Sequence, residues 1–141
     1  MTSAAVDVRS GALDKITREQ MIAEFGENGV QNPMVIDLIT LDKASDTVVL
    51  VMTERRPWGA VAEQLTQQFN QIEEKVNRYM GYVLDGFLAE HYPQYLGKAV
   101  RIRLDCAEAA HGESARFVEA MTDAIEGHGI HFAMTVLPPL A

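Results

Sequence analysis

The chain has 141 residues, a formal net charge of −8 and a single cysteine, and these properties narrow its class. A chain of this length fits one domain. Its acidic charge repels a phosphate backbone or an anionic membrane surface, so we expect neither nucleic acid nor a membrane as a partner. One cysteine cannot form an intramolecular disulfide, and no window reaches the apolar length of a membrane span, so we expect a cytoplasmic protein.

The beginning of the chain divides into two predicted parts. Residues 1–15 lack apolar periodicity and are expected to form a flexible tail, whereas residues 16–141 are expected to form a single α/β domain. Within that domain, Thr17 and Gln20 form a T-x-x-Q capping box. A short helix is predicted to follow and to end at Phe25, before Gly26.

Two strands joined by a polar turn come next. Residues 34–41 are rich in β-branched and apolar side chains, 42–46 have the composition of a turn, and 47–53 form the second strand. Within the second strand, Val48 to Met52 is an unbroken apolar run. Such a run is typical of a central strand that is covered on both faces.

The longest predicted element is a helix over residues 58–90, with Pro57 at its start. One face is marked by apolar residues at alternating spacings of four and three: Leu65, Phe69, Ile72, Val76, Tyr79, Val83 and Phe87. At about 1.5 Å per residue this helix would be roughly 50 Å long, which exceeds the diameter of a compact domain of this size. We therefore expect it either to kink near Gly81 or to project and pack on a partner.

The C-terminal part of the sequence alternates strand and helix. Residues 99–106 place Val100, Ile102 and Leu104 on one side and charged residues on the other, which is typical of a strand with one wet face. A helix is predicted from Glu113 to Gly127, and a last strand over 131–137. The order is α-β-β-α-β-α-β, and right-handed crossovers join the last three strands. We therefore predict an α/β fold of the α+β two-layer type: a four-stranded mixed sheet of order 1-2-3-4, its first strand antiparallel at one edge and both long helices on one face.

Several motifs resemble a known family. They are Val35-Ile36-Asp37-Leu38, Arg56-Pro57-Trp58-Gly59, Leu84-Asp85-Gly86, Tyr92-Pro93 and the stretch from Arg101 to Cys106. Together they resemble a family of short bacterial proteins catalogued only as a domain of unknown function, over residues 35–137. The resemblance implies a bacterial, stand-alone cytoplasmic protein, and it implies no activity and no catalytic residue.

The carboxyl ends of the predicted parallel strands gather the candidate reactive groups. In open α/β sheets this edge is where ligands bind. Glu54, Asp105, Cys106 and His111 are the candidate catalytic residues there, with Glu108 nearby and Arg55 as a candidate ligand-binding residue. The competing interpretation is ordinary loop polarity, with Cys106 as a small buried apolar residue.

Asp37 interrupts an apolar strand and is a second candidate ligand-binding residue. A buried carboxylate needs a partner, and Arg101 or Arg103 would supply it, so a structural ion pair is favoured over a catalytic role. His128 and His131 bracket a turn, but no further metal ligands lie near them. The sequence has no phosphate-binding loop. We therefore expect no metal and no cofactor.

Two functions remain open at this point. The first is a non-enzymatic protein-interaction module that forms a homodimer and has a further protein as a candidate partner, with its interface around Trp58, Leu65, Phe69 and Ile72. The second is a small enzyme or ligand-binding domain that uses the carboxyl ends of the parallel strands. The first is favoured because the helix is too long for the domain and no catalytic motif is complete.

Overall fold

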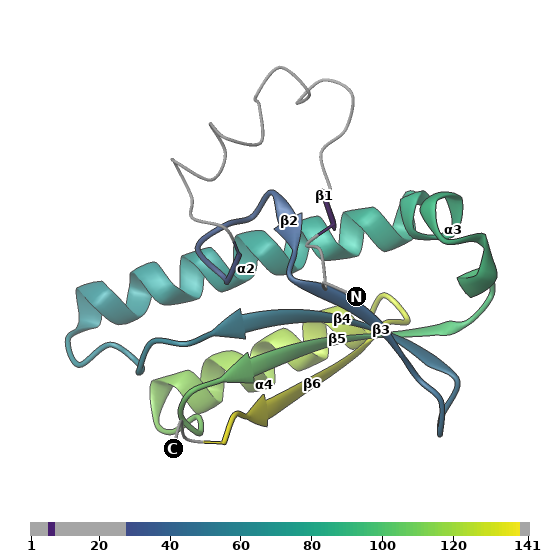
Figure 1. The fold of residues 1–141 in the computed structure, drawn as a ribbon. Coiled ribbons are helices and arrows are strands. Elements are labelled where there is room, and N and C mark those ends of the chain that lie inside the picture. Colours follow the sequence, from purple (N-terminus) through teal and green to yellow (C-terminus); the bar gives the residue numbers. More distant parts are fainter. Residues whose placement is uncertain (1–5, 8–27, 139–141) are drawn as a thin grey trace.

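A four-stranded mixed sheet forms one layer of the computed structural model, which describes residues 6–7 and 28–138 (Figure 1). Its strands, in spatial order, are β3 (Leu38–Asp42), β4 (Thr47–Glu54), β5 (Ala99–Cys106) and β6 (His131–Val136). β3 pairs antiparallel with β4, whereas β4, β5 and β6 run parallel. The predicted α+β class with a mixed four-stranded sheet is confirmed.

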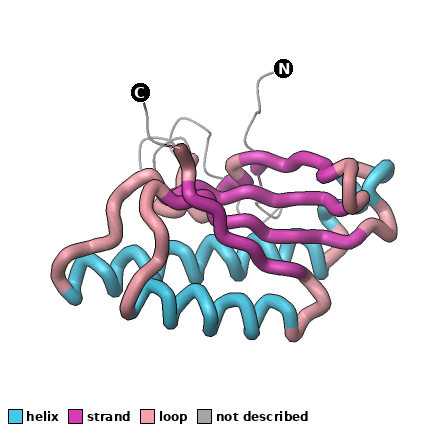
Figure 2. Tube along the Cα trace, turned by 90° about the horizontal axis from the view of Figure 1, so that it is seen from below, coloured by secondary structure: helices cyan, strands magenta, loops and turns pink. Residues whose placement is uncertain are grey.

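The second layer consists of two long helices on one face of the sheet, as predicted. α2 (Ala62–Leu84) and α4 (Glu113–Glu126) lie side by side below the strands in Figure 2. The short helix α3 (Phe87–His91) and the 3-10 turn η2 (Pro93–Tyr95) carry the chain from α2 to β5. Within the described part of the chain, no helix has the length and apolar character that crossing a membrane requires.

The first predicted strand differs in detail, because it is divided at Asp37. Its first part is the two-residue strand β2 (Val35–Ile36), which pairs antiparallel with β1 (Val6–Asp7), and its second part is β3. The backbone N–H of Asp37 donates to the hydroxyl of Tyr79 at 3.0 Å. The chain therefore bends at this residue, and only the part that follows it, β3, belongs to the four-stranded sheet.

The long helix is interrupted, not at Gly81 but five residues later, at Gly86. α2 ends at Leu84, and Gly86 has φ +89°, in the left-handed region where a side chain is strained. Pro57 does not begin the helix either, since α2 starts at Ala62. At about 1.5 Å per residue, α2 is roughly 35 Å long, which a domain of this size accommodates.

The main core lies between the sheet and the two long helices. Its side chains from the sheet include Val48, Leu50 and Met52 on β4 and Ile102 and Leu104 on β5, all of them buried. The charged side chains of β5 point to the opposite face, so the alternation predicted for this strand is confirmed.

The opposite face of β4 is covered as well. Val49 and Val51 are 2% and 3% exposed, and Val35 is fully buried, although none of them belongs to the main core. Cover on both sides of β4 was predicted, and it is confirmed. The two long helices lie on the other face, so the side chains of Val49 and Val51 are enclosed by other residues of this chain.

Two predictions lie outside the described residues. They are the capped helix ending at Phe25 and, apart from the two residues of β1, the flexible tail over residues 1–15.

Candidate functional site

Among the candidate acids at the carboxyl ends of the strands, Glu54 lies beside Cys106, and its side chain is paired with Arg56. It is 1% exposed and stands beside Cys106 in the parallel register of β4 and β5. Arg56 binds both of its oxygens: Nε donates to Oε1 at 2.9 Å and Nη2 donates to Oε2 at 2.7 Å. The backbone N–H of Arg56 also donates to Oε1. This bidentate pair fixes the turn that leaves β4 and keeps the Glu54 carboxylate occupied.

Asp105 lies on the other face of the sheet, away from Glu54. Nε of Arg103 donates to its Oδ1 at 2.8 Å, and Nη2 of Arg103 donates to its Oδ2 at 3.1 Å. The hydroxyl of Thr135 on β6 donates to Oδ1 as well. Successive residues of a strand point to opposite faces, so Asp105 and Cys106 cannot act on one substrate from the same side.

Cys106 is a buried thiol in the main core. It is 1% exposed, and burial, together with the negative charges of Glu54 and Asp105, raises its pKa from 9.0 to about 12. The thiolate is the nucleophilic form of cysteine, and it is scarce at neutral pH in such a site. The interpretation of Cys106 as a small buried apolar residue therefore fits its surroundings.

The remaining candidates at this edge serve the loops. The hydroxyl of Ser114 donates to the carbonyl of His111 and accepts from the N–H of His111, both at 2.8 Å, which fixes the turn before α4. Glu108 accepts from the backbone N–H of Trp58 at 3.0 Å. Arg55 is exposed and donates to Asn28 Oδ1 at 3.4 Å. The structure thus brings only Glu54 and Cys106 together among the four catalytic candidates.

Asp37 is the centre of a buried ionic network, but its partner is a lysine on α2. Lys75 Nζ donates to Asp37 Oδ1 at 2.7 Å, and the two side chains are 0% and 3% exposed. The expectation of Arg101 or Arg103 as the partner is wrong: Arg101 pairs with Asp42, and Arg103 pairs with Asp105. Both arginines lie on the outer face of the sheet, whereas Asp37 turns toward α2.

Every donor of the Lys75 ammonium has an acceptor. Besides Asp37, its Nζ donates to the carbonyls of Gly29 at 2.6 Å and Asn32 at 2.8 Å. Burial lowers the pKa of Lys75, an effect that the charge of Asp37 opposes. An ammonium group whose three N–H donors all have acceptors is held in one orientation.

The Asp37 carboxylate and the Tyr79 hydroxyl join the same segment to β4. Asp37 accepts from the backbone N–H groups of Gly29 and Thr53, both at 2.9 Å. The hydroxyl of Tyr79 donates to the carbonyl of Val51 at 2.7 Å, and burial raises its pKa well above the usual value. The network therefore ties residues 28–37 to α2 and to the sheet, which is a structural task.

A signal for Lys75 was present in the sequence. It stands three residues after Ile72 and four before Tyr79, so it lies within the apolar stripe of the helix. A charged residue in that position requires a buried partner, and Asp37 was the one acid in an apolar strand.

The four residues expected at an interface pack inside this chain. Ile72 is fully buried and Trp58 is 8% exposed. Phe69 stacks on Phe117 of α4 with ring centroids 4.2 Å apart, and Leu65 packs against the same core. This stretch of α2 therefore packs against α4 of the same chain.

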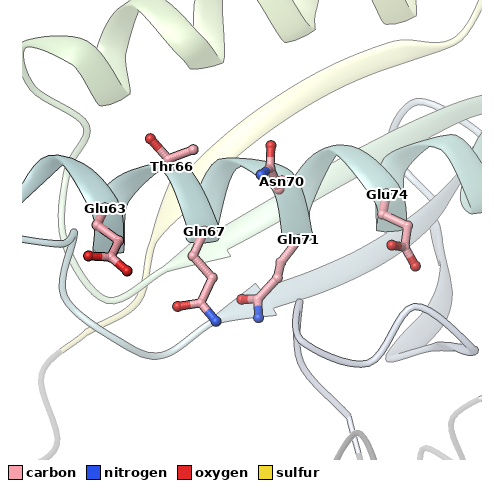
Figure 3. Close-up of a pocket in the computed structure, with 6 residues that line it drawn as sticks. All are labelled: Glu63, Thr66, Gln67, Asn70, Gln71 and Glu74. Atoms are coloured by element: carbon pink, nitrogen blue, oxygen red, sulfur yellow. The ribbon is translucent and has the colours of Figure 1, made fainter.

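Two shallow pockets lie along the outer side of α2. The first, of about 440 Å³, is lined by six residues of this helix alone: Glu63, Thr66, Gln67, Asn70, Gln71 and Glu74 (Figure 3). The second, of about 480 Å³, adjoins it and extends to Arg56 and Trp58. In the described part of the chain, no three His, Cys, Asp or Glu side chains gather closely enough to hold a metal ion.

These features define the class of the protein. It is a two-layer α+β protein, and the buried charged side chains of its described residues are paired with other groups of the same chain. A family model described as a family of unknown function, DUF6572, matches residues 28–138. The chain belongs to this family, which confirms the resemblance to a domain of unknown function. No curated protein and no solved structure matches the chain.

Proposed function

We propose that this protein is a non-enzymatic interaction module that acts as a homodimer and presents the paired chains to a further protein. The observation that carries the proposal is that the Glu54 carboxylate is buried and paired within the chain. It is the candidate acid closest to the cysteine, and Arg56 binds both of its carboxylate oxygens while the chain excludes water from it.

The other reactive groups at this edge support the same proposal. A general acid or base has to reach the reacting atom, and a nucleophile has to be activated by a neighbour. Asp105 is engaged by Arg103 and Thr135, and the pKa of Cys106 is raised. We also expect the protein in the bacterial cytoplasm, where a lone buried thiol remains reduced.

Two measurements test this proposal together. Sedimentation equilibrium of the full chain from about 1 to 100 μM is expected to give a mass that rises from one chain to two. A thermal-shift panel of metal ions and common anionic metabolites is expected to leave the melting temperature unchanged. A mass of one chain throughout this range, or a ligand that raises the melting temperature by several degrees, would overturn the proposal.

The second pocket favours an alternative, a small-molecule site at the same end of the sheet. Arg56, Trp58 and three glutamines line it, so its chemistry suits a small polar or anionic ligand. The variant Gln67→Ala separates the two functions, because Gln67 lines both pockets and is exposed. A ligand-induced shift that Gln67→Ala abolishes, and that exposed Thr66→Ala retains, would favour the alternative.

A further inference from the structure

The outer edge of β6 presents a row of backbone hydrogen-bonding groups that no described strand uses. β6 is the last strand of the four-stranded sheet, and none of the described strands pairs with its outer side. The N–H of Leu137 donates to the carbonyl of Cys106 on β5 at 2.7 Å. Because alternate residues of a strand direct their N–H and C=O groups to opposite sides, those of Phe132, Met134 and Val136 point away from β5.

The residues of β6 itself include none of the charged or proline residues that usually protect an edge strand. Natural edge strands are shielded by lysine, proline, an inward-pointing charge or a bulge. From His131 to Val136 the sequence HFAMTV has no Asp, Glu, Lys, Arg or Pro. Val136 is 52% exposed, and Met134 is only partly buried. The other edge strand, β3, is shorter and ends at Asp42, which pairs with Arg101.

We propose that β6 pairs antiparallel with β6 of a second copy of this chain, so that the two sheets become one continuous sheet across a two-fold axis. This inference rests on the proposed homodimer and names its surface. A second copy fits because the outward groups match themselves: with Met134 on the axis, Met134 faces Met134, and Phe132 faces Val136. This register uses the outward groups of all three residues in both copies.

The size of the edge sets the expected strength of the dimer. Six residues at about 3.3 Å each make the strand about 20 Å long, and the 14 residues of α4 beside it span a similar length at about 1.5 Å each. With a sheet and a helix layer about 20 Å deep together, the contact face is roughly 400 Å² for each copy. Contacts of this size lie at the low end for specific complexes, so a micromolar dissociation constant is expected.

The first test removes one outward donor without touching the ladder inside the chain. Val136→Pro deletes an N–H that points away from β5, and proline is tolerated at such edge positions. The matched control, Val136→Ala, shortens the same side chain and keeps the N–H. We expect Val136→Pro to weaken the dimer at least about tenfold in sedimentation equilibrium, because each copy loses one hydrogen bond to the other. Val136→Ala is expected to stay within about threefold of the original chain.

Cysteine cross-linking locates the axis and remains decisive if the proline variant does not fold. In the proposed register, the Cα atoms of the two Met134 residues are about 5.5 Å apart, a separation that a disulfide spans. Met134→Cys is therefore expected to cross-link under mild oxidation. Ala124→Cys, at an exposed position of α4, is expected to remain monomeric on a denaturing gel, and the buried Cys106 does not compete.

The outcomes separate this inference from the proposed function. Cross-linking at Ala133, Met134 or Thr135 when each is changed to cysteine supports pairing of the two β6 strands, and the position that reacts gives the register. A dimer in which none of these cysteines cross-links would refute the edge pairing while the homodimer remains. A chain that stays monomeric to 100 μM would remove both.

Discussion

Replacing Lys75 with methionine removes the charge that faces Asp37 while keeping a side chain of similar length. The Asp37 carboxylate then stays buried without its cation, since both side chains of the pair are almost fully enclosed. Removing one partner of a buried ion pair costs about 3–5 kcal/mol. The Gly29 carbonyl also loses the donor that lies 2.6 Å away, which adds about 1 kcal/mol or more.

This loss is a large part of the total stability, because the free energy of unfolding of a domain is about 5–15 kcal/mol. Urea unfolding followed by circular dichroism measures the free energy of unfolding, and in thermal unfolding the melting temperature of Lys75→Met is expected to fall by about 10–20 °C. The control is Lys98→Met, since Lys98 also pairs with an aspartate, Asp46, but on the surface. The control is expected to cost less than about 1 kcal/mol.

A double variant tests the reasoning behind the number. If Lys75 and Asp37 stabilise the chain through each other, Lys75→Met combined with Asp37→Asn costs less than the sum of the two single variants. Equal costs for Lys75→Met and Lys98→Met, or strict additivity of the two buried substitutions, would show that the pair contributes no more than a surface contact.

Three other predictions concern the thiol, the glycines and the net charge. The folded chain retains the Cys106 proton from pH 9.0 to about 12 whereas the unfolded chain releases it, so stability falls as the pH rises through this window. Cys106→Ala is expected to flatten that fall between pH 8 and 10 in urea titrations, and a fall equally steep in the variant would contradict the assignment. Gly86→Ala is expected to destabilise the chain by about 1–2 kcal/mol, because the backbone at Gly86 is left-handed with φ +89°. Gly81→Ala is expected to stabilise it by about 0.5–1 kcal/mol, because Gly81 lies inside α2 with room for a side chain. Melting temperatures of the two variants that move in the same direction would count against this reasoning. With a net charge of −8 on each chain, the dimer is expected to tighten as salt rises from 0.05 to about 0.5 M, and sedimentation showing a weaker dimer in high salt would exclude repulsion as the dominant long-range force.

Much of the fold was predictable because its signals are local. The alternation of Val100, Ile102 and Leu104 with charged residues identified β5 and its wet face, and the apolar run in β4 identified a central strand. The rule for right-handed crossovers then placed both long helices on one face. These features depend on periodicity and connection, which a sequence displays directly.

What could not be predicted depends on which elements meet in space. Phe69 has the same apolar character whether it stacks on Phe117 of its own chain or on a partner, so its contact with Phe117 could not be predicted from the sequence. The end of α2 depends on the left-handed residue Gly86, although Gly81 carries the same local signal. Asp37 was recognised as requiring a partner, but the sequence does not show that Asp37 faces Lys75 and not Arg101 or Arg103.

The network around Lys75 also bears on the order of events in folding. Its three acceptors lie 38 to 46 residues away along the chain, in a segment with only a two-residue strand of its own. We expect the ammonium to reach all three acceptors only after α2 has docked on β4, and these bonds therefore to form late in folding. Substitutions at Lys75 should therefore act on the unfolding limb of the chevron and leave the folding limb nearly unchanged. The lifetime of the native state, more than the speed of folding, is therefore expected to depend on Lys75.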